Sequence, residues 1–327
     1  MMVSLPRACT LSAALLLVSP ACLALDGSHL KQRADAVLML MSYTVVPDVT
    51  ASDLNIGSGT NEKNQLSITQ FGGGATLSKR YPIYLEGTLG YSRYDPQFVL
   101  SNGDDSRTIP AKWNSLTGTG GIGWDFNLYT DKWGGTLVLR PIFNFMLGTM
   151  ASDVRMLGTM ASDVRIGSRL IEHKRDADFK FLDGGRLNAY GLGGSLMLDY
   201  ELFSKEQDID VELRYSGMSL QTFGSTPEAV SGQSSAENLG LYLRRRAPIS
   251  DWTLLKSPVR YVLEGAHTEY LGDQRGQLGF NGLSSLGVGL ELDSSQYPVF
   301  ISRTRLVARY MFGDNTRGYG VGLAMSF

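Results

Sequence analysis

Every second residue is apolar along much of the chain, most clearly from residue 190 onward. In the last segment, 317–327, apolar or aromatic residues alternate with glycine, alanine and serine. Successive side chains of a β-strand point to opposite faces, so a period of two predicts a strand with one apolar face. Polar, charged or small residues take the second face of earlier segments such as 190–202 and 209–216. The pattern therefore predicts an all-β protein.

Twelve strands are predicted if residues 37–46 are counted as the first. In chain order they are 37–46, 66–78, 83–92, 116–128, 137–145, 190–202, 209–216, 238–246, 259–264, 285–292, 300–312 and 317–327. The strand at 66–78 changes phase across its three consecutive glycines, 72–74, which predicts a β-bulge there.

The connections between these strands alternate in length. Short turns are expected near residues 79–81, 130–133, 204–207, 248–256 and 294–299. Longer connections are expected at 48–64, 95–111, 147–185, 223–234 and 271–282, with 313–316 as the one short exception. Short turns at one end, longer loops at the other and an even strand count are typical of transmembrane barrels. We therefore expect a transmembrane up-and-down antiparallel β-barrel of about 12 strands, with both termini in the periplasm and the longer loops outside.

The segment 25–47 is open to two interpretations. A helix is indicated by five residues at helical spacing: Leu30, Ala34, Val37, Leu38 and Met41. Residues 37–46 fit a first strand equally well. If the segment is a helix, the predicted strand count becomes odd, and another strand must lie elsewhere.

The amino terminus has the features of a secretory signal. A short apolar stretch at 11–18 follows the positive charge of Arg7 and ends before a small-x-small cleavage sequence. This predicts a signal peptide at 1–24 and an outer-membrane barrel at 25–327. No later stretch of eighteen or more apolar residues occurs, so no transmembrane helix is expected.

Composition narrows the classes of function. The formal net charge of −2 argues against nucleic acid as a partner. Both cysteines, Cys9 and Cys22, lie in the predicted signal peptide, so the mature chain has no thiol chemistry. No metal-ligand spacing and no phosphate-binding loop occurs, so neither a metal nor another cofactor is expected. We expect a monomer.

A tandem copy of ten residues lies where the longest loop is predicted. Residues 146–155 are repeated letter for letter as 156–165. Two copies are too few for a solenoid, which needs several repeats to bury a core. We interpret the repeat as a duplication tolerated in a long extracellular loop at 147–185.

Charged residues on the second face of the strands are expected to point into the lumen. The acidic segment 199–212 precedes the basic segment 244–260, so rows of opposite sign are expected to face each other. Such a cluster either selects a solute at a constriction or fills a narrow barrel with ion pairs. The candidate lumenal residues are Asp125, Asp199, Glu201, Asp210, Glu212, Arg244, Arg246, Arg260, Glu264, Glu291, Arg303, Arg305 and Arg309.

Catalysis has one candidate residue. Of the three histidines, His267 is predicted near the outer end of its strand, beside Thr268 and Glu269. Counting by twos places it on the lipid-facing side unless a bulge at Gly265 reverses the phase. We therefore expect no enzymatic activity. The alternative is a hydrolase of the lipid A deacylase, phospholipase or protease type with a rim active site around His267.

The C-terminal strand resembles that of Gram-negative outer-membrane β-barrels, in which a final aromatic residue and alternate apolar positions are read by the assembly machinery. The resemblance implies the outer membrane of a Gram-negative bacterium as the location. It implies as partners the barrel-assembly machinery, periplasmic chaperones, outer-membrane lipid and lipopolysaccharide. The residues that would form the assembly signal are Tyr319, Gly322, Leu323, Met325 and Phe327.

Residues from about 240 onward, especially 283–293 and 304–327, look like the translocator barrels of autotransporters. Those barrels have twelve strands and an N-terminal helix that can plug the pore. The chain resembles most closely the solitary, passenger-less group, because few residues separate the predicted cleavage site from the first predicted element. The resemblance implies a channel, or a structural or interaction protein, rather than secretion of a passenger.

Overall fold

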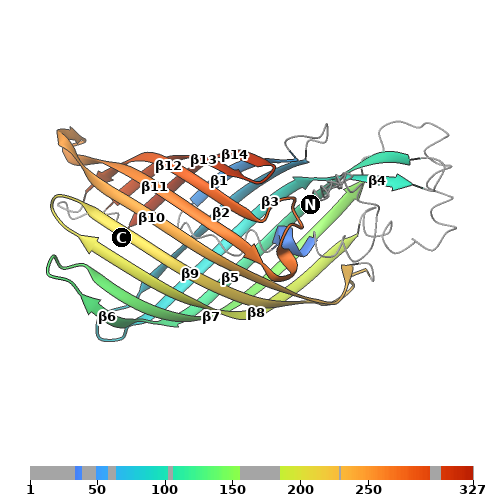
Figure 1. The fold of residues 1–327 in the computed structure, drawn as a ribbon, viewed down its shortest axis with the longest axis horizontal. Helices are drawn as coiled ribbons and strands as arrows, with labels where there is room; N and C mark the ends of the chain where they lie inside the picture. Colours follow the sequence, from blue (N-terminus) through green and yellow to red (C-terminus); the bar gives the residue numbers. More distant parts are fainter. Residues whose placement is uncertain are drawn as a thin grey trace, which may run out of the picture.

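A single antiparallel sheet closes on itself to form the molecule. The computed structural model describes residues 34–38, 49–57, 64–101, 106–154, 185–227, 230–294 and 303–326. The first strand of this sheet, β1, pairs with the last, β14, from Val49 opposite Leu323 to Ile56 opposite Thr316. The result is a barrel of strongly tilted strands (Figure 1). The predicted all-β, twelve-stranded antiparallel barrel is confirmed.

Fourteen strand segments make the twelve strands of the wall. Segment β4 extends β3 beyond Pro96, and β6 extends β5 beyond Asp125. The segments are β1 (Val49–Ile56), β2 (Asn64–Thr76), β3 (Ile83–Asp95), β4 (Gln97–Ser101), β5 (Ser106–Trp124), β6 (Phe126–Thr130), β7 (Thr136–Val154), β8 (Arg186–Phe203), β9 (Asp208–Thr222), β10 (Gln233–Leu254), β11 (Ser257–Leu271), β12 (Gly282–Asp293), β13 (Arg303–Gly313) and β14 (Thr316–Ser326).

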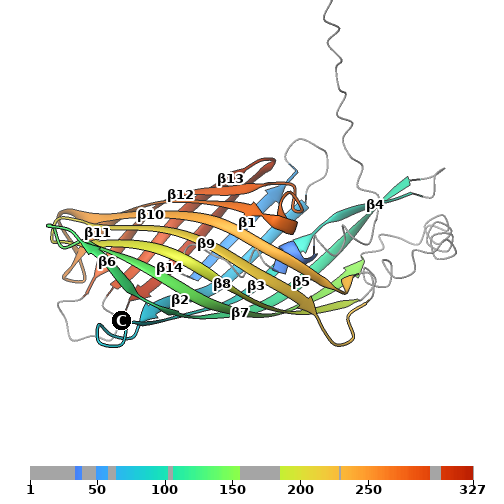
Figure 2. The ribbon, with the colours of Figure 1, turned by 60° about the horizontal axis from the view of Figure 1, so that its bottom comes forward.

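The two ends of the barrel differ in their connections. Turns of two to six residues lie at the end where β14 finishes, at 77–82, 131–135, 204–207 and 255–256 (Figure 2). Most connections at the opposite end are longer, and the turn at 314–315 is the short exception that the pattern predicted. In bacterial transmembrane barrels the short turns are periplasmic, so we call these the periplasmic end and the outer end.

The outer surface of the wall is apolar across its middle. Its exposed side chains include Phe71, Leu89, Leu116, Phe143, Leu196, Leu241, Leu263, Val288, Leu306 and Val321. Hydrocarbon cannot satisfy backbone donors and acceptors, so strands that cross it must close on themselves. A closed sheet with this surface is an integral barrel of the outer membrane.

No helix among the described residues is long and apolar enough to cross a membrane.

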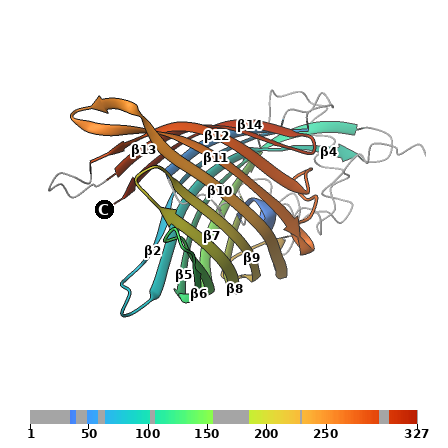
Figure 3. The same ribbon diagram turned by 60° about the vertical axis from the view of Figure 1, so that its left-hand side comes forward.

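The first strand is not where the alternation placed it. Residues 34–38 form a short helix inside the barrel (Figures 1 and 3), so of the two interpretations the helix is confirmed there. Val37 and Leu38 are not in a strand, and residues 39–46 lie outside the described residues. The missing strand is β1, which lies within the loop predicted at 48–64. Its buried side chains Leu54 and Ile56 point inward, while Asp53 points outward. Pattern reading missed β1 because its polarity is opposite to that of a lipid-facing strand.

The phase change in β2 has the same origin. Leu66 and Ile68 point inward toward the helix, whereas Phe71 points outward. The pairing of β2 with β3 runs without a register shift from Gln65 to Thr76, so the predicted bulge is wrong. The apolar face changes sides because the lumen is apolar near the outer end and polar below it.

Other predicted connections are partly strand as well, and β10 runs through most of the turn predicted at 248–256. Segments β4 and β5 enter the predicted loop at 95–111, and β7 extends to Val154, well into the loop predicted at 147–185. Residues 146–154 of the first repeat copy therefore belong to the wall, with Met146 and Met150 buried on its inner side. The second copy, 156–165, lies outside the described residues.

The register of the closing pair can be tested with cysteines, since the mature chain has none. We predict that Ala51→Cys with Val321→Cys forms a disulfide, because these residues are direct partners in β1 and β14. The barrel should then keep its compact electrophoretic mobility on heating until reductant is added. Ala51→Cys with Tyr319→Cys is two residues out of register and serves as the control. Equal cross-linking of both pairs would contradict the register.

Candidate functional site: the filled lumen

Inward-facing charged side chains gather in the periplasmic half of the barrel. They form two networks on neighbouring parts of the wall that meet at β9. The larger, which we call the arginine network, lies on β9 to β13. It consists of Asp208, Asp210, Arg244, Arg246, Arg260, Glu264, Glu291, Asp293, Arg303, Arg305 and Arg309.

The core of the arginine network is buried and multiply bridged. Arg246 Nη1 donates to Glu291 Oε2 at 3.0 Å, and Arg260 Nη1 lies 2.8 Å from Asp208 Oδ2. Glu264 receives two bonds from Arg309, at 2.7 and 3.0 Å. Glu291 and Asp208 are each about 1% exposed. Buried charges need such partners, because desolvation without pairing is costly.

The second network, the Arg140–Arg214 network, spans β3 to β9. Its members are Tyr84, Glu86, Asp125, Arg140, Asn144, Ser195, Asp199, Arg214 and Ser216. The Arg140 guanidinium bonds both Asp125 and Asp199, the latter at 2.9 Å, and lies 4.0 Å from the centre of the Tyr84 ring. Arg214 binds Glu86 through two nitrogens, at 2.6 and 3.0 Å. Two parallel hydrogen bonds of this kind fix the orientation of the guanidinium and also pair its charge.

Two of these ion pairs cross the lumen. Glu86 is on β3 and Arg214 on β9, four strands away around the wall. Arg303 on β13 lies 3.3 Å from Asp208, at the start of β9, which is again four strands away. Side chains that meet over such a separation must occupy the interior rather than line it. The periplasmic half is therefore filled at these levels.

Glycines on the inner face make room for the crossing side chains. A Cβ at Gly74 would collide with the hydroxyl of Tyr84. One at Gly121 would lie 2.7 Å from both Glu86 and Asn144, closer than Cβ atoms approach other heavy atoms. Glycines at these positions of the strands therefore leave the space that the inward-pointing side chains occupy.

Most predicted lumenal residues do come together. Asp210 bonds Arg244 on the adjacent strand at 2.7 Å, as the facing rows predicted. Asp199 instead pairs with Arg140 of β7. Glu201 and Glu212 face the lumen half-buried, and neither makes an ion pair among the described residues. The remaining predicted residues, apart from Asp125 beside Arg140, belong to the arginine network.

Sequence reasoning missed five charged members of these networks. They are Glu86, Arg140, Asp208, Arg214 and Asp293. Each lies on the inward parity of its strand or at its inner end, so the alternation that identified the others contained the same signal. The sequence did not show which strands the ion pairs would join across the lumen.

An apolar collar fills the outer half of the lumen around the helix. All five residues of 34–38 are buried, at 4% exposure or less. Tyr94 and Trp113 pack edge to face with ring centres 5.7 Å apart. The collar is formed by Leu54, Ile56, Leu66, Ile68, Tyr94, Trp113, Met146, Met150, Leu187, Ala189, Met218, Leu220, Ala236, Tyr270, Leu278 and Phe280.

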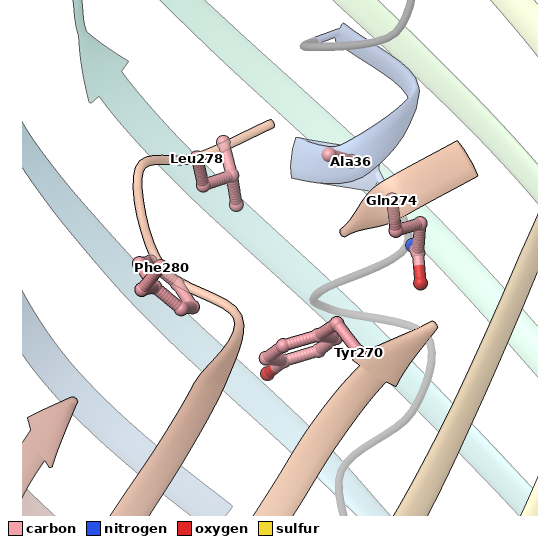
Figure 4. A pocket seen from close by; sticks show the side chains of 5 residues that line it. All are labelled: Ala36, Tyr270, Gln274, Leu278 and Phe280. Carbon is pink, nitrogen blue, oxygen red and sulfur yellow. The ribbon is translucent and has the colours of Figure 1, made fainter. Parts of the chain in front are cut away.

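A hydrogen bond from the wall also holds the helix. Asp35 accepts a hydrogen bond from the Ser234 hydroxyl of β10 at 2.6 Å. A cavity of about 10 Å³ remains beside the helix between Ala36, Tyr270 and Phe280, with Gln274 and Leu278 completing its lining (Figure 4). That volume is about the size of a single water site, too small for an organic ligand.

His267 lies on the outside of the wall, as the alternation predicted. The pairing of β11 runs through Gly265 without a bulge. His267 Nδ1 is 2.9 Å from the Ser284 hydroxyl on β12, and its Nε2 is 3.8 Å from a Glu269 carboxylate oxygen. The imidazole is about half exposed. The Ser284 contact joins a cross-strand pair, and the Glu269 distance is too long for a hydrogen bond.

The C-terminal strand presents its apolar residues outward. Tyr319 is 72% exposed and Met325 46% exposed on the outer surface, and Gly322 is buried. Leu323 is partly exposed. Phe327 lies outside the described residues. The role of these residues as an assembly signal stays a prediction.

The fold is shared with autotransporter translocators. The transport unit of the autotransporter AIDA-I from Escherichia coli matches 93% of this chain and 100% of its own, with 11% identity and a TM-score of 0.50. The beta domain of the Bordetella autotransporter BrkA matches 85% of this chain and 97% of its own, with 15% identity and a TM-score of 0.44. The translocator domain of NalP from Neisseria meningitidis matches 86% and 87%, with 15% identity and a TM-score of 0.42.

At these sequence identities the similarity shows only the fold, and this conclusion rests on the match to the AIDA-I transport unit. The expected resemblance to autotransporter translocator barrels is confirmed at this level. No protein-family model matches the chain, and no curated protein matches it.

The crossing pair can be tested by a double-mutant cycle. We predict that Glu86→Gln lowers the free energy of unfolding by about 3 kcal/mol, because it leaves Arg214 buried without its counter-charge. Arg214→Gln should cost a similar amount, and the double variant should cost less than the sum by roughly 2 kcal/mol. Urea unfolding of the refolded barrel in vesicles measures these values.

Glu201→Gln is the matched control, since Glu201 also faces the lumen but makes no ion pair with another described residue. It should change stability by no more than about 0.5 kcal/mol. Additive effects of Glu86→Gln and Arg214→Gln would show that the pair does not couple the two sides of the barrel.

Proposed function

We propose that the protein is a passenger-less barrel of the autotransporter translocator type. In its resting state it is closed, and it acts as a structural or interaction protein of the outer membrane. It conducts only if its closures are removed. The observation that carries the proposal is the pair of ion bridges that cross the lumen between strands four apart.

Two closures of different chemistry lie in series along the lumen. The outer one is the helix in its apolar collar, and the inner one is formed by the two charged networks. An apolar seal excludes water and ions, because hydration is lost without compensation. The ion-paired seal blocks the lumen because its side chains occupy the space, and each crossing pair is attached to the wall on two different strands. A channel would require both to open, which distinguishes this proposal from a pore closed by a plug alone.

Planar-bilayer recording tests the closed state. We predict no conductance steps from the refolded mature chain, and none or only small ones after deletion of residues 25–47. Large steps should appear when the deletion is combined with alanine at the crossing pairs, Glu86, Arg214, Asp208 and Arg303, because the lumen then loses both closures. Heat-modifiable mobility on gels confirms that each variant has folded.

A steady open conductance from the intact chain would contradict the proposal. Full-sized steps from the deletion alone would show that the helix is the only closure. The lumenal charges would then line a pore, and the porin-like channel would be the better description.

We also propose that the protein is not an enzyme. The rival is the rim hydrolase around His267, and it is favoured by one observation, the 2.9 Å contact between His267 Nδ1 and the Ser284 hydroxyl. General-base catalysis needs this proximity. A serine hydrolase also needs donors for the developing oxyanion, and at this position the neighbouring strands pair with each other. We therefore regard the contact as a cross-strand hydrogen bond.

Ester hydrolysis by the refolded barrel tests the rival. We predict that mature protein in mixed micelles hydrolyses phospholipid or short-chain nitrophenyl esters no faster than His267→Ala. Ser285→Ala, next to Ser284 in the sequence, is the control. Hydrolysis that falls at least about 100-fold in both His267→Ala and Ser284→Ala, but not in Ser285→Ala, would establish the enzyme.

The partners proposed for this function are those of any integral outer-membrane barrel. They are outer-membrane lipid and lipopolysaccharide, the barrel-assembly machinery and periplasmic chaperones. We propose a monomer, because the ion pairs of the charged networks are made within one chain. Nucleic acid, metals and cofactors play no part in the proposal.

A further inference from the structure

The periplasmic turns share a composition that the filled lumen does not explain. Each of the four described turns, 77–82, 131–135, 204–207 and 255–256, contains at least one lysine or arginine. Each also contains or adjoins a large apolar or aromatic side chain that is more than half exposed: Tyr81, Trp133, Phe203 and Leu255. The basic side chains are Lys79, Arg80, Lys132, Lys205 and Lys256, against the acids Asp131 and Glu206.

In two turns the cation lies over the ring. The Lys132 ammonium is 4.5 Å from the centre of the Trp133 ring, and the Arg80 guanidinium is 5.5 Å from that of Tyr81. Trp133 is 70% exposed and Tyr81 56% exposed. A cation over an exposed ring presents a positive group and an apolar plate together, which suits the boundary between lipid head groups and hydrocarbon.

The nearby Asp131 does not cancel Lys132. Its carboxylate accepts bonds from the backbone N–H of Trp133 and of Gly135, both at 2.8 Å. It also accepts a bond from the Tyr200 hydroxyl at 2.6 Å. The acid is therefore committed to holding the turn, while Lys132 and Trp133 project from it.

The turn at 255–256 presents its apolar residue at a conformational cost. Leu255 and Lys256 have φ values of 52° and 64°, a region that favours glycine or asparagine. Leu255 is 81% exposed, and Trp252 in the same hairpin is 51% exposed. The two-residue turn between β10 and β11 requires a positive φ at both of its positions, and the residues that occupy them place an apolar and a basic side chain at the tip.

The described connections at the outer end differ. Asp314 and Asn315 form the β13–β14 turn without a basic residue. Arg275 lies near the Glu269 carboxylate, at 3.9 Å, and Phe280 in the same connection is buried. Among the described connections, the turn residues of the periplasmic end therefore combine a cation with an exposed apolar side chain, and those of the outer end that are described do not.

The placement of the turns favours lipid over a protein partner. They follow β2, β6, β8 and β10, and so are spaced around the rim rather than gathered in one patch. A folded partner needs a contiguous surface, whereas lipid surrounds the wall. Basic side chains are attracted to anionic head groups, and exposed aromatic side chains belong at the level of the glycerol.

We propose that the periplasmic rim binds anionic phospholipid head groups. Lys132 and Lys256 contact lipid phosphate, and the rings of Trp133 and Trp252 lie beside the glycerol and the first acyl carbons. The rim thereby fixes the depth of the barrel in the periplasmic leaflet. This inference uses only the location in the membrane, and holds whether or not the lumen conducts.

Tryptophan quenching by brominated lipid tests it directly. Trp133 and Trp252 are at the rim, Trp113 is buried in the collar, and Trp124→Phe removes the remaining tryptophan from the wall. The barrel is refolded in phosphatidylcholine vesicles that contain either brominated phosphatidylglycerol or brominated phosphatidylcholine. We expect phosphatidylglycerol to be preferred by about fivefold or more at low salt, and the preference to vanish near 1 M salt.

Lys132→Gln with Lys256→Gln should abolish most of that preference. Arg186→Gln with Arg275→Gln removes the same charge from the outer end and should leave it unchanged. All four side chains are exposed, and gel mobility confirms folding. Equal quenching by the two lipids, or an equal loss in both double variants, would overturn the proposal. Absence of lipid preference with lysine-dependent co-sedimentation on purified peptidoglycan would also overturn it, in favour of a cell-wall contact.

Discussion

The backbone hydrogen bonds between the first and last strands are the constraint from which the rest of the structure follows. In hydrocarbon an unpaired sheet edge would leave a row of donors and acceptors without partners. Pairing of Val49 to Ile56 with Thr316 to Leu323 removes both edges at once. Closure then divides every strand into a face toward lipid and a face toward an enclosed space, and each face is selected for different chemistry.

The enclosed space of a twelve-stranded barrel is narrow enough for side chains to meet across it. Long arginines therefore reach carboxylates four strands away, as Arg214 reaches Glu86. Such pairs are costly to bury unless their geometry is satisfied, and here glycines such as Gly121 provide the space. The charged interior is thus a packed core made of polar groups, and this argues for a closed resting state.

The outer half of the same lumen follows the opposite rule. A short helix of small and apolar residues occupies it, so the wall facing the helix is apolar and the outward side chains near the rim are polar. Strand β2 crosses the boundary between the apolar and the polar half of the lumen, and the described part of β1 lies mainly in the apolar half. One strand face can therefore be polar at one level and apolar at another, and a single rule of alternation fails where the occupant of the lumen changes.

The alternation along the chain was enough to predict a closed antiparallel barrel, the end at which the short turns lie and the inward parity of residues such as Arg246 and Glu291. These properties depend on the two-residue period of apolar side chains and on the composition of the turns, and both can be recognised in local sequence. The predicted count of twelve matched the structure, but it was reached with a strand at 37–46 in place of β1. The assembled barrel was needed to place β1 at Val49–Ile56, to show that residues 34–38 are helical, and to pair Asp199 with Arg140. Those outcomes depend on which residues face one another across the lumen, and that distance is set by closure of the whole sheet rather than by any local segment.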